Sequence, residues 1–84
     1  MNLDMQVVIM GAFRYALGRM TYVVDSTCNV IEATRAEMPT NQLKMMVNEI
    51  IVAGEDGKLG MQMDENRWEK CREILEYEIE SRKE

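Results

Sequence analysis

Residues that interrupt helices are scarce in this chain and, apart from Gly11, lie at three places. The 84 residues include one proline, Pro39, and only five glycines. Gly18 follows one apolar helical pattern, Pro39 ends a second, and residues 54–63 (Gly-Glu-Asp-Gly-Lys-Leu-Gly-Met-Gln-Met) form the one clear loop. Because proline and glycine break helices, four long segments remain. This spacing predicts an all-α fold, a single domain over residues 1–84 built as a compact bundle of about four helices.

The first segment is predicted to be a helix over residues 4–17, with Asp4 as its N-cap. Its inner face follows the i, i+3, i+4 spacing of a helix and contains Met5, Ile9, Ala12, Phe13, Ala16 and Leu17. Val7, Val8 and Met10 widen this face. A helix that is apolar on most sides is buried on most sides, so we expect it to be central or to pack against another copy. The competing interpretation is a strand over residues 5–10, because Val-Val-Ile favours β-structure.

The second segment is predicted to be a helix from Thr21 to Glu37. Gly18 suits a left-handed C-cap before it, and Thr21 is its expected N-cap. Its apolar positions are Val24, Cys28 and Ile31, and its polar side carries Asp25, Asn29 and Glu32. The result is a helix–corner–helix unit with its corner at residues 18–20.

The last two segments are predicted helices over residues 41–53 and 64–82, with Thr40 or Asn41 capping the first and Asp64 opening the second. Their buried stripes are Leu43, Met46, Val47, Ile50 and Ile51 in one, and Trp68, Cys71, Leu75 and Ile79 in the other. Arg72–Glu76 and Glu78–Arg82 have the i, i+4 spacing of ion pairs. Leu59, Met61 and Met63 alternate, which predicts a short extended segment over the helices.

Catalytic chemistry is poorly represented. The sequence has no histidine, which is the commonest general base and metal ligand. Cys28 and Cys71 lack a Cys-x-x-Cys partner and are expected to be reduced core thiols. The acidic loop does not match a calcium-binding pattern, and no phosphate-binding loop or nucleophile motif occurs. We therefore expect a protein that is not an enzyme and that uses no cofactor or metal.

The net charge differs between the first 36 residues and the rest of the chain. Residues 1–36 are balanced, so the whole net charge of −5 lies in residues 37–84. This half repels a phosphate backbone, which makes direct nucleic-acid binding a poor expectation. A row of glutamates on the last predicted helix forms a candidate acidic surface: Glu69, Glu73, Glu76 and Glu80. One interpretation is a solvated face; the other is a surface that imitates nucleic acid and binds a basic protein groove.

Two cations and two aromatics flank the corner after the first helix. Arg14, Tyr15, Arg19 and Tyr22 form a candidate anion or partner contact, because a helix N-terminus with a nearby arginine attracts anions. The alternatives are that the arginines only favour a helix C-terminus, or that the residues contact another protein.

The run AFRYALGRMTYVV, from Ala12 to Val24, resembles the N-terminal signature of small accessory proteins encoded by phages and prophages of Gram-positive bacteria. The resemblance is strong over about a dozen positions and assigns no catalytic residue. Many such accessory proteins counter bacterial defence systems, including CRISPR systems. The resemblance implies a genomic context and a protein acting in the cytoplasm of an infected host cell.

Three functional hypotheses follow. The first is a non-catalytic inhibitor of a bacterial defence system, similar to an anti-CRISPR protein, which binds a host protein stoichiometrically. The second is a small-molecule binder that sequesters a phosphorylated signal nucleotide through Arg14 and Arg19, with Tyr15 or Tyr22 stacked on the base. The third is a structural or regulatory homo-oligomer. No apolar run is long enough to span a membrane, and the N-terminus lacks the pattern of a signal peptide, so no membrane association is expected.

Overall fold

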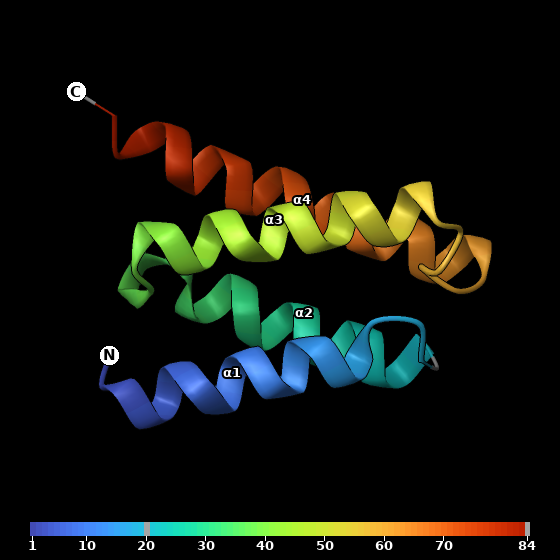
Figure 1. Ribbon diagram of the computed structural model, residues 1–84, viewed down its shortest axis with the longest axis horizontal. Helices are drawn as coiled ribbons and strands as arrows, with labels where there is room; N and C mark the ends of the chain where they lie inside the picture. The colour runs from blue at the N-terminus through green and yellow to red at the C-terminus, as the bar shows by residue number, and fades with distance from the viewer. Residues whose placement is uncertain (20, 84) are drawn as a thin grey trace.

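The computed structural model describes residues 1–19 and 21–83, and within them the chain forms four α-helices and no strand. The helices are α1 (Leu3–Ala16), α2 (Thr21–Thr34), α3 (Thr40–Glu55) and α4 (Gln62–Ser81), with a short 3₁₀ helix η1 (Arg35–Glu37) after α2. Successive α-helices run antiparallel, and α1 and α4 lie on opposite sides of the bundle (Figure 1). The all-α bundle predicted from the sequence is confirmed.

The core is formed by one face of each α-helix and by two residues between helices, Met38 and Leu59. Its buried apolar side chains are Ile9, Phe13, Ala16, Val24, Cys28, Ile31, Met38, Leu43, Met46, Ile50, Leu59, Trp68, Cys71 and Leu75. At its centre the rings of Phe13 on α1 and Trp68 on α4 meet edge to face, with centroids 5.5 Å apart and planes at 86°, a favoured aromatic geometry. Several residues of the predicted buried faces are less buried than expected. Val47, Ile79 and Leu17 are half-buried, and Ile51, Met5 and Ala12 are exposed.

The predicted helix ends need correction. The N-cap of α1 is Asn2, whose side-chain oxygen accepts a hydrogen bond from the Met5 amide at 2.8 Å, and Asp4 lies inside the first turn. Pro39 and Met61 precede α3 and α4, so Thr40, Asn41 and Asp64 are helical residues and not caps. Thr21 is the first residue of α2, and the Met20 before it lies outside the described residues.

Two segments differ from their predicted conformation. Helix α2 ends at Thr34 and tightens into η1, because Pro39 removes a backbone donor and disfavours the helical conformation of the residue before it. The expected extended segment is also wrong. Leu59 is buried, but Met61 is 76% exposed and Met63 is 67% exposed and belongs to α4. The loop between α3 and α4 therefore covers residues 56–61, shorter than the predicted 54–63.

Helix α1 lies at an edge of the bundle, so the expectation that it is central is wrong. Of its 14 residues only Ile9, Phe13 and Ala16 are buried. It packs mainly on α2, whereas α4 packs on both α2 and α3. Four apolar side chains of α1 are largely exposed: Leu3, Met5, Val7 and Val8. The other predicted arrangement, packing against a second copy, is compatible with this exposure.

Gly18 is the glycine on which the α1–α2 corner depends. Its φ is +80°, and a Cβ at this position would lie 3.1 Å from the backbone oxygen of Lys58. Non-glycine residues pay about 1–2 kcal/mol in this left-handed region. We expect Gly18→Ala to lower the free energy of unfolding by about 2 kcal/mol, adding the close contact to the backbone strain, as measured by urea denaturation in dilute solution.

Gly11→Ala is the matched control. Gly11 lies inside α1, and a Cβ there would meet nothing within 4 Å. Alanine should stabilise this position by about 0.5–1 kcal/mol, because glycine is the poorer helix former. Equal effects of the two substitutions would contradict the structural role assigned to Gly18.

Candidate functional site

The candidate acidic surface lies along one exposed side of α4. Glu73, Glu76 and Glu80 are exposed and Glu69 is half-buried, one helical turn apart from one another. Seven acidic and three basic residues fall between Gln62 and Ser81, which gives α4 a net charge of −4 out of the −5 of the whole chain. The negative charge of the molecule is therefore concentrated on one helix at one side of the bundle.

Two cations reduce the charge of this row. Arg72 contacts Glu69 at 2.6 Å and also pairs with Glu76, which confirms the predicted i, i+4 pair. The hydrogen bond that Arg72 donates to Glu69, supported by the charge of Glu76, raises the pKa of Arg72. Lys83 contacts Glu80 at 3.1 Å. Glu73 is exposed and makes no ion pair with any described residue, so it carries the least compensated charge of the row.

The four residues of the candidate anion contact have separate surroundings. Arg14 pairs with Glu49 on α3 through two bonds, Nε to Oε1 at 3.1 Å and Nη2 to Oε2 at 3.3 Å. Arg19 donates from Nε to the Tyr15 carbonyl at 3.0 Å, and its guanidinium lies 4.8 Å from the centre of the Tyr15 ring. The structure thus brings Arg19 and Tyr15 together, while an anion at Arg14 would compete with the Glu49 carboxylate.

Tyr22 lines a different groove, between the first turns of α2 and α4. This groove has a volume of about 620 Å³ and is lined by Thr21, Tyr22, Asp25, Met63, Asn66, Arg67 and Lys70. The lining includes none of Arg14, Tyr15 and Arg19. The cations that share this groove with Tyr22 are Arg67 and Lys70, and not the Arg14 or Arg19 that the sequence pattern associated with it.

Arg67 connects α4 to α2 and was not identified from the sequence. Its guanidinium donates to Asp25 at 2.9 Å, to Glu32 at 2.6 Å and to the side-chain oxygen of Asn29 at 2.8 Å. The hydrogen bond with Glu32, reinforced by that with Asp25, raises the pKa of Arg67. The available signal was the spacing of the three acceptors, which places them on one side of the second helix.

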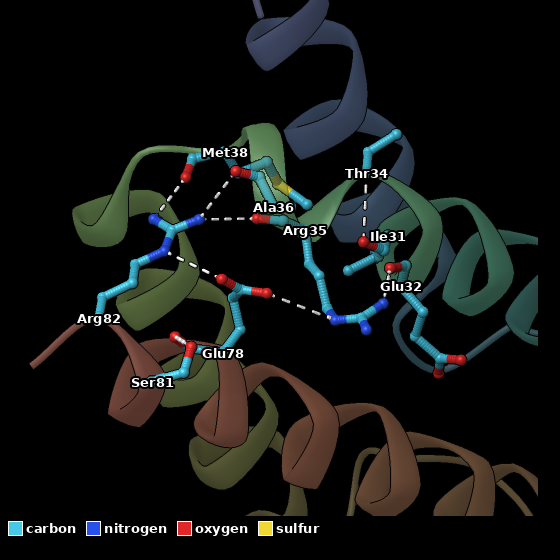
Figure 2. Close-up of polar contacts among 9 residues, drawn as sticks. All are labelled: Ile31, Glu32, Thr34, Arg35, Ala36, Met38, Glu78, Ser81 and Arg82. Carbon is cyan, nitrogen blue, oxygen red and sulfur yellow. Dashed lines mark hydrogen bonds and ion pairs between the residues drawn. The ribbon is translucent and has the colours of Figure 1, made fainter.

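Arg82 follows the last residue of α4 and connects this helix to the backbone of residues 35–38 (Figure 2). It donates to the carbonyl of Met38 at 2.7 Å, that of Arg35 at 2.9 Å and that of Ala36 at 3.2 Å. Its Nε also contacts Glu78 at 3.2 Å, which confirms the predicted i, i+4 pair, and Glu78 in turn contacts Arg35 at 3.5 Å. A helix that ends before a proline leaves carbonyl groups without intrahelical partners. Pro39 in the sequence therefore indicated that another side chain would donate hydrogen bonds to these carbonyls, although not which one.

The two cysteines are free, and both are buried in the core. A hydrogen bond with Cys28, together with burial, raises the pKa of the Cys71 thiol, so that the core holds it protonated. Among the described residues, no group of three or more His, Cys, Asp or Glu could hold a metal ion. No helix in the described part of the chain is both long and apolar enough to cross a membrane.

Comparisons with protein-family models, with curated proteins and with solved structures find no match to this chain.

The Cys71 thiol predicts alkaline instability. A raised pKa in the folded state means that the unfolded chain loses this proton first as the pH rises, so the unfolded state binds fewer protons. The contribution of this thiol to the free energy of unfolding is then unaffected below the ordinary cysteine value of about 9.0 and falls above it, by up to about 1.4 kcal/mol per pH unit.

Urea denaturation between pH 7 and pH 10.5 measures this slope, and Cys71→Ala is the matched variant. The substitution lowers stability at every pH by opening a small cavity, but it should make the alkaline slope shallower. An identical slope in the two proteins would contradict the assignment.

Proposed function

We propose that this chain is a non-catalytic inhibitor encoded by a phage or prophage, which binds a basic, nucleic-acid-binding groove of a bacterial defence protein in the host cytoplasm. The observation that carries the proposal is the exposed glutamate row of α4, Glu69, Glu73, Glu76 and Glu80. The resemblance of residues 12–24 to phage accessory proteins supports the class of target.

The charge spacing of the row supports an imitation of nucleic acid. Glu69 and Glu80 are 11 positions apart, so the row is about 16 Å long at about 1.5 Å per residue. One strand of B-DNA carries about five phosphates over this length, at about 3.4 Å each. Four carboxylates on one side of a helix approach that density. Arg72 reduces it by occupying Glu69 and Glu76.

The row is also held in place before any partner binds. Arg67 ties the first half of α4 to α2, and Arg82 ties its last turn to the carbonyls of residues 35–38. A helix fixed at both ends loses little conformational freedom on binding, and preorganisation of this kind strengthens association. The acidic surface is therefore presented as one rigid unit.

The proposal predicts opposite effects of two substitutions on the same helix. Glu73→Lys combined with Glu80→Lys should raise Kd at least about tenfold, because like charges would face each other across the interface. Arg72→Gln should instead tighten binding a few-fold, because it releases Glu69 and Glu76. Both effects should shrink as the salt concentration rises.

Binding is measured by calorimetry with a purified RNA-guided nuclease from a Gram-positive host, and inhibition by the rate at which that nuclease cleaves target DNA. Glu37→Lys is the control, since it reverses one glutamate on η1, away from the row, as each half of the double variant does within it. An unchanged Kd in the double variant, or an equal loss with Glu37→Lys, would reject α4 as the binding surface.

A further inference from the structure

The outward side of α1 carries a regular row of four residues. Asp4, Val7, Gly11 and Arg14 follow one another at steps of three, four and three, and all four are exposed. This is the spacing of a heptad seam, through which one helix packs along another. The buried residues of α1 lie on its other side, and the row stays exposed although Arg14 contacts Glu49 of α3 and Val7, Gly11 and Arg14 border the groove toward α3.

This region is also the main concentration of exposed apolar surface. Of the thirteen exposed large hydrophobic side chains in the described residues, seven lie on α1 or on the walls of the grooves beside it: Leu3, Met5, Val7, Val8, Tyr15, Val30 and Met45. One groove, of about 440 Å³, separates α1 from α3, and the other, of about 230 Å³, separates α1 from α2. Exposed apolar patches of this kind mark interaction surfaces.

The charges of α1 indicate which molecule covers its exposed side. The α1 helix has one acidic residue, Asp4, near its start and one basic residue, Arg14, near its end, so its net charge is zero. In an antiparallel pair of α1 helices whose midpoint is Ile9, a residue n positions before Ile9 in one copy faces the residue n positions after Ile9 in the other. Asp4 then faces Arg14 of the second copy, and Arg14 faces its Asp4. The row is complementary in charge to itself in this one orientation.

The same register is complementary in shape. Val7 faces Gly11 of the second copy, so that a branched side chain meets a position without one. A Cβ at Gly11 would contact nothing within 4 Å in the monomer, although glycine inside a helix costs about 1 kcal/mol relative to alanine. The absence of a side chain there leaves room for close approach of two helix axes, which pack 8–10 Å apart depending on the contacting side chains.

We infer that a second copy of this chain covers α1, forming an antiparallel two-fold dimer with α1 packed against α1. A two-fold interface uses the same patch on both partners, as this row requires. An interface of standard size covers about 800 Å² per partner, about one seventh of the accessible surface of 5351 Å². The strongly negative α4 lies on the opposite side of the bundle (Figure 1), which limits repulsion between the copies.

Arg14 is able to serve both partners. Its bonds to Glu49 use Nε and Nη2, so Nη1 remains for the Asp4 of the second copy. Its side chain is 53% exposed even while it holds Glu49. Asp4 makes no ion pair with any other described residue.

The test is sedimentation equilibrium of the purified chain, without any other protein present. The mass should rise with concentration from 9.8 kDa to twice that value and no further. Charge reversal then tests the register in a Glu49→Gln background, which removes the intramolecular partner of Arg14. Asp4→Arg alone and Arg14→Asp alone should each raise the dimer Kd at least about tenfold, because each places like charges together at two symmetric contacts.

The double variant, Asp4→Arg with Arg14→Asp, should restore the dimer Kd to within about threefold of the background protein, because it exchanges the two charges. Val7→Asp should abolish dimerisation while circular dichroism shows an unchanged helical content. The inference is overturned if the wild-type chain stays monomeric at millimolar concentration, if the double variant is no better than the single ones, or if the mass rises beyond that of a dimer. Glu73→Lys, which tests α4, should leave the dimer Kd unchanged, so the two proposals can fail separately.

Discussion

The structure depends on how one acidic helix is kept in the bundle. Helix α4 carries a net charge of −4 and has only a narrow buried stripe, whose largest member is Trp68. Burial of that stripe is supplemented by two arginines, since Arg67 binds three side chains of α2 and Arg82 binds the carbonyls that η1 leaves open. Hydrogen bonds to charged groups are the stronger class. These contacts fix the first half of α4 against α2 and its C-terminal end against η1.

The position of α4 determines how much of the core α1 can contact. Because α4 packs against α2 and α3, much of the core lies among these three helices, and α1 contributes Ile9, Phe13 and Ala16, of which Phe13 meets Trp68 edge to face. A domain of this size buries only a modest share of its surface. Helix α1, at the edge of the bundle, therefore keeps much of its apolar surface exposed, as Leu3, Val7 and Val8 show. The molecule carries most of its net charge on α4 at one side and this apolar surface on α1 at the other (Figure 1).

The number and type of helices were predictable because breakers are few and the apolar spacing is regular. The ends were less predictable, since Asn2 caps α1 where Asp4 was expected, and Thr34 ends α2 before the 3₁₀ turn. Pairs within one helix, such as Glu78–Arg82, follow from spacing alone. Arg67 and Arg82 make their decisive contacts with residues 35 to 47 positions away, and sequence spacing does not reveal which distant helix a side chain faces. The same limit explains why Arg14 was grouped with Arg19, although it contacts α3.

The two proposed surfaces use different residues and are compatible in space. A two-fold axis through the outward side of α1 leaves the α4 of each copy directed away from the other, because α1 and α4 lie on opposite sides of the bundle (Figure 1). Each copy contributes a net charge of −5, and repulsion between exposed charges is largely screened beyond about 8 Å at physiological salt. Dimerisation through a neutral helix therefore adds little electrostatic cost, whereas dimerisation through α4 would place two like-charged rows together. A dimer of this form presents two acidic rows, and a target with two basic grooves within reach would bind it with the added strength of multivalency.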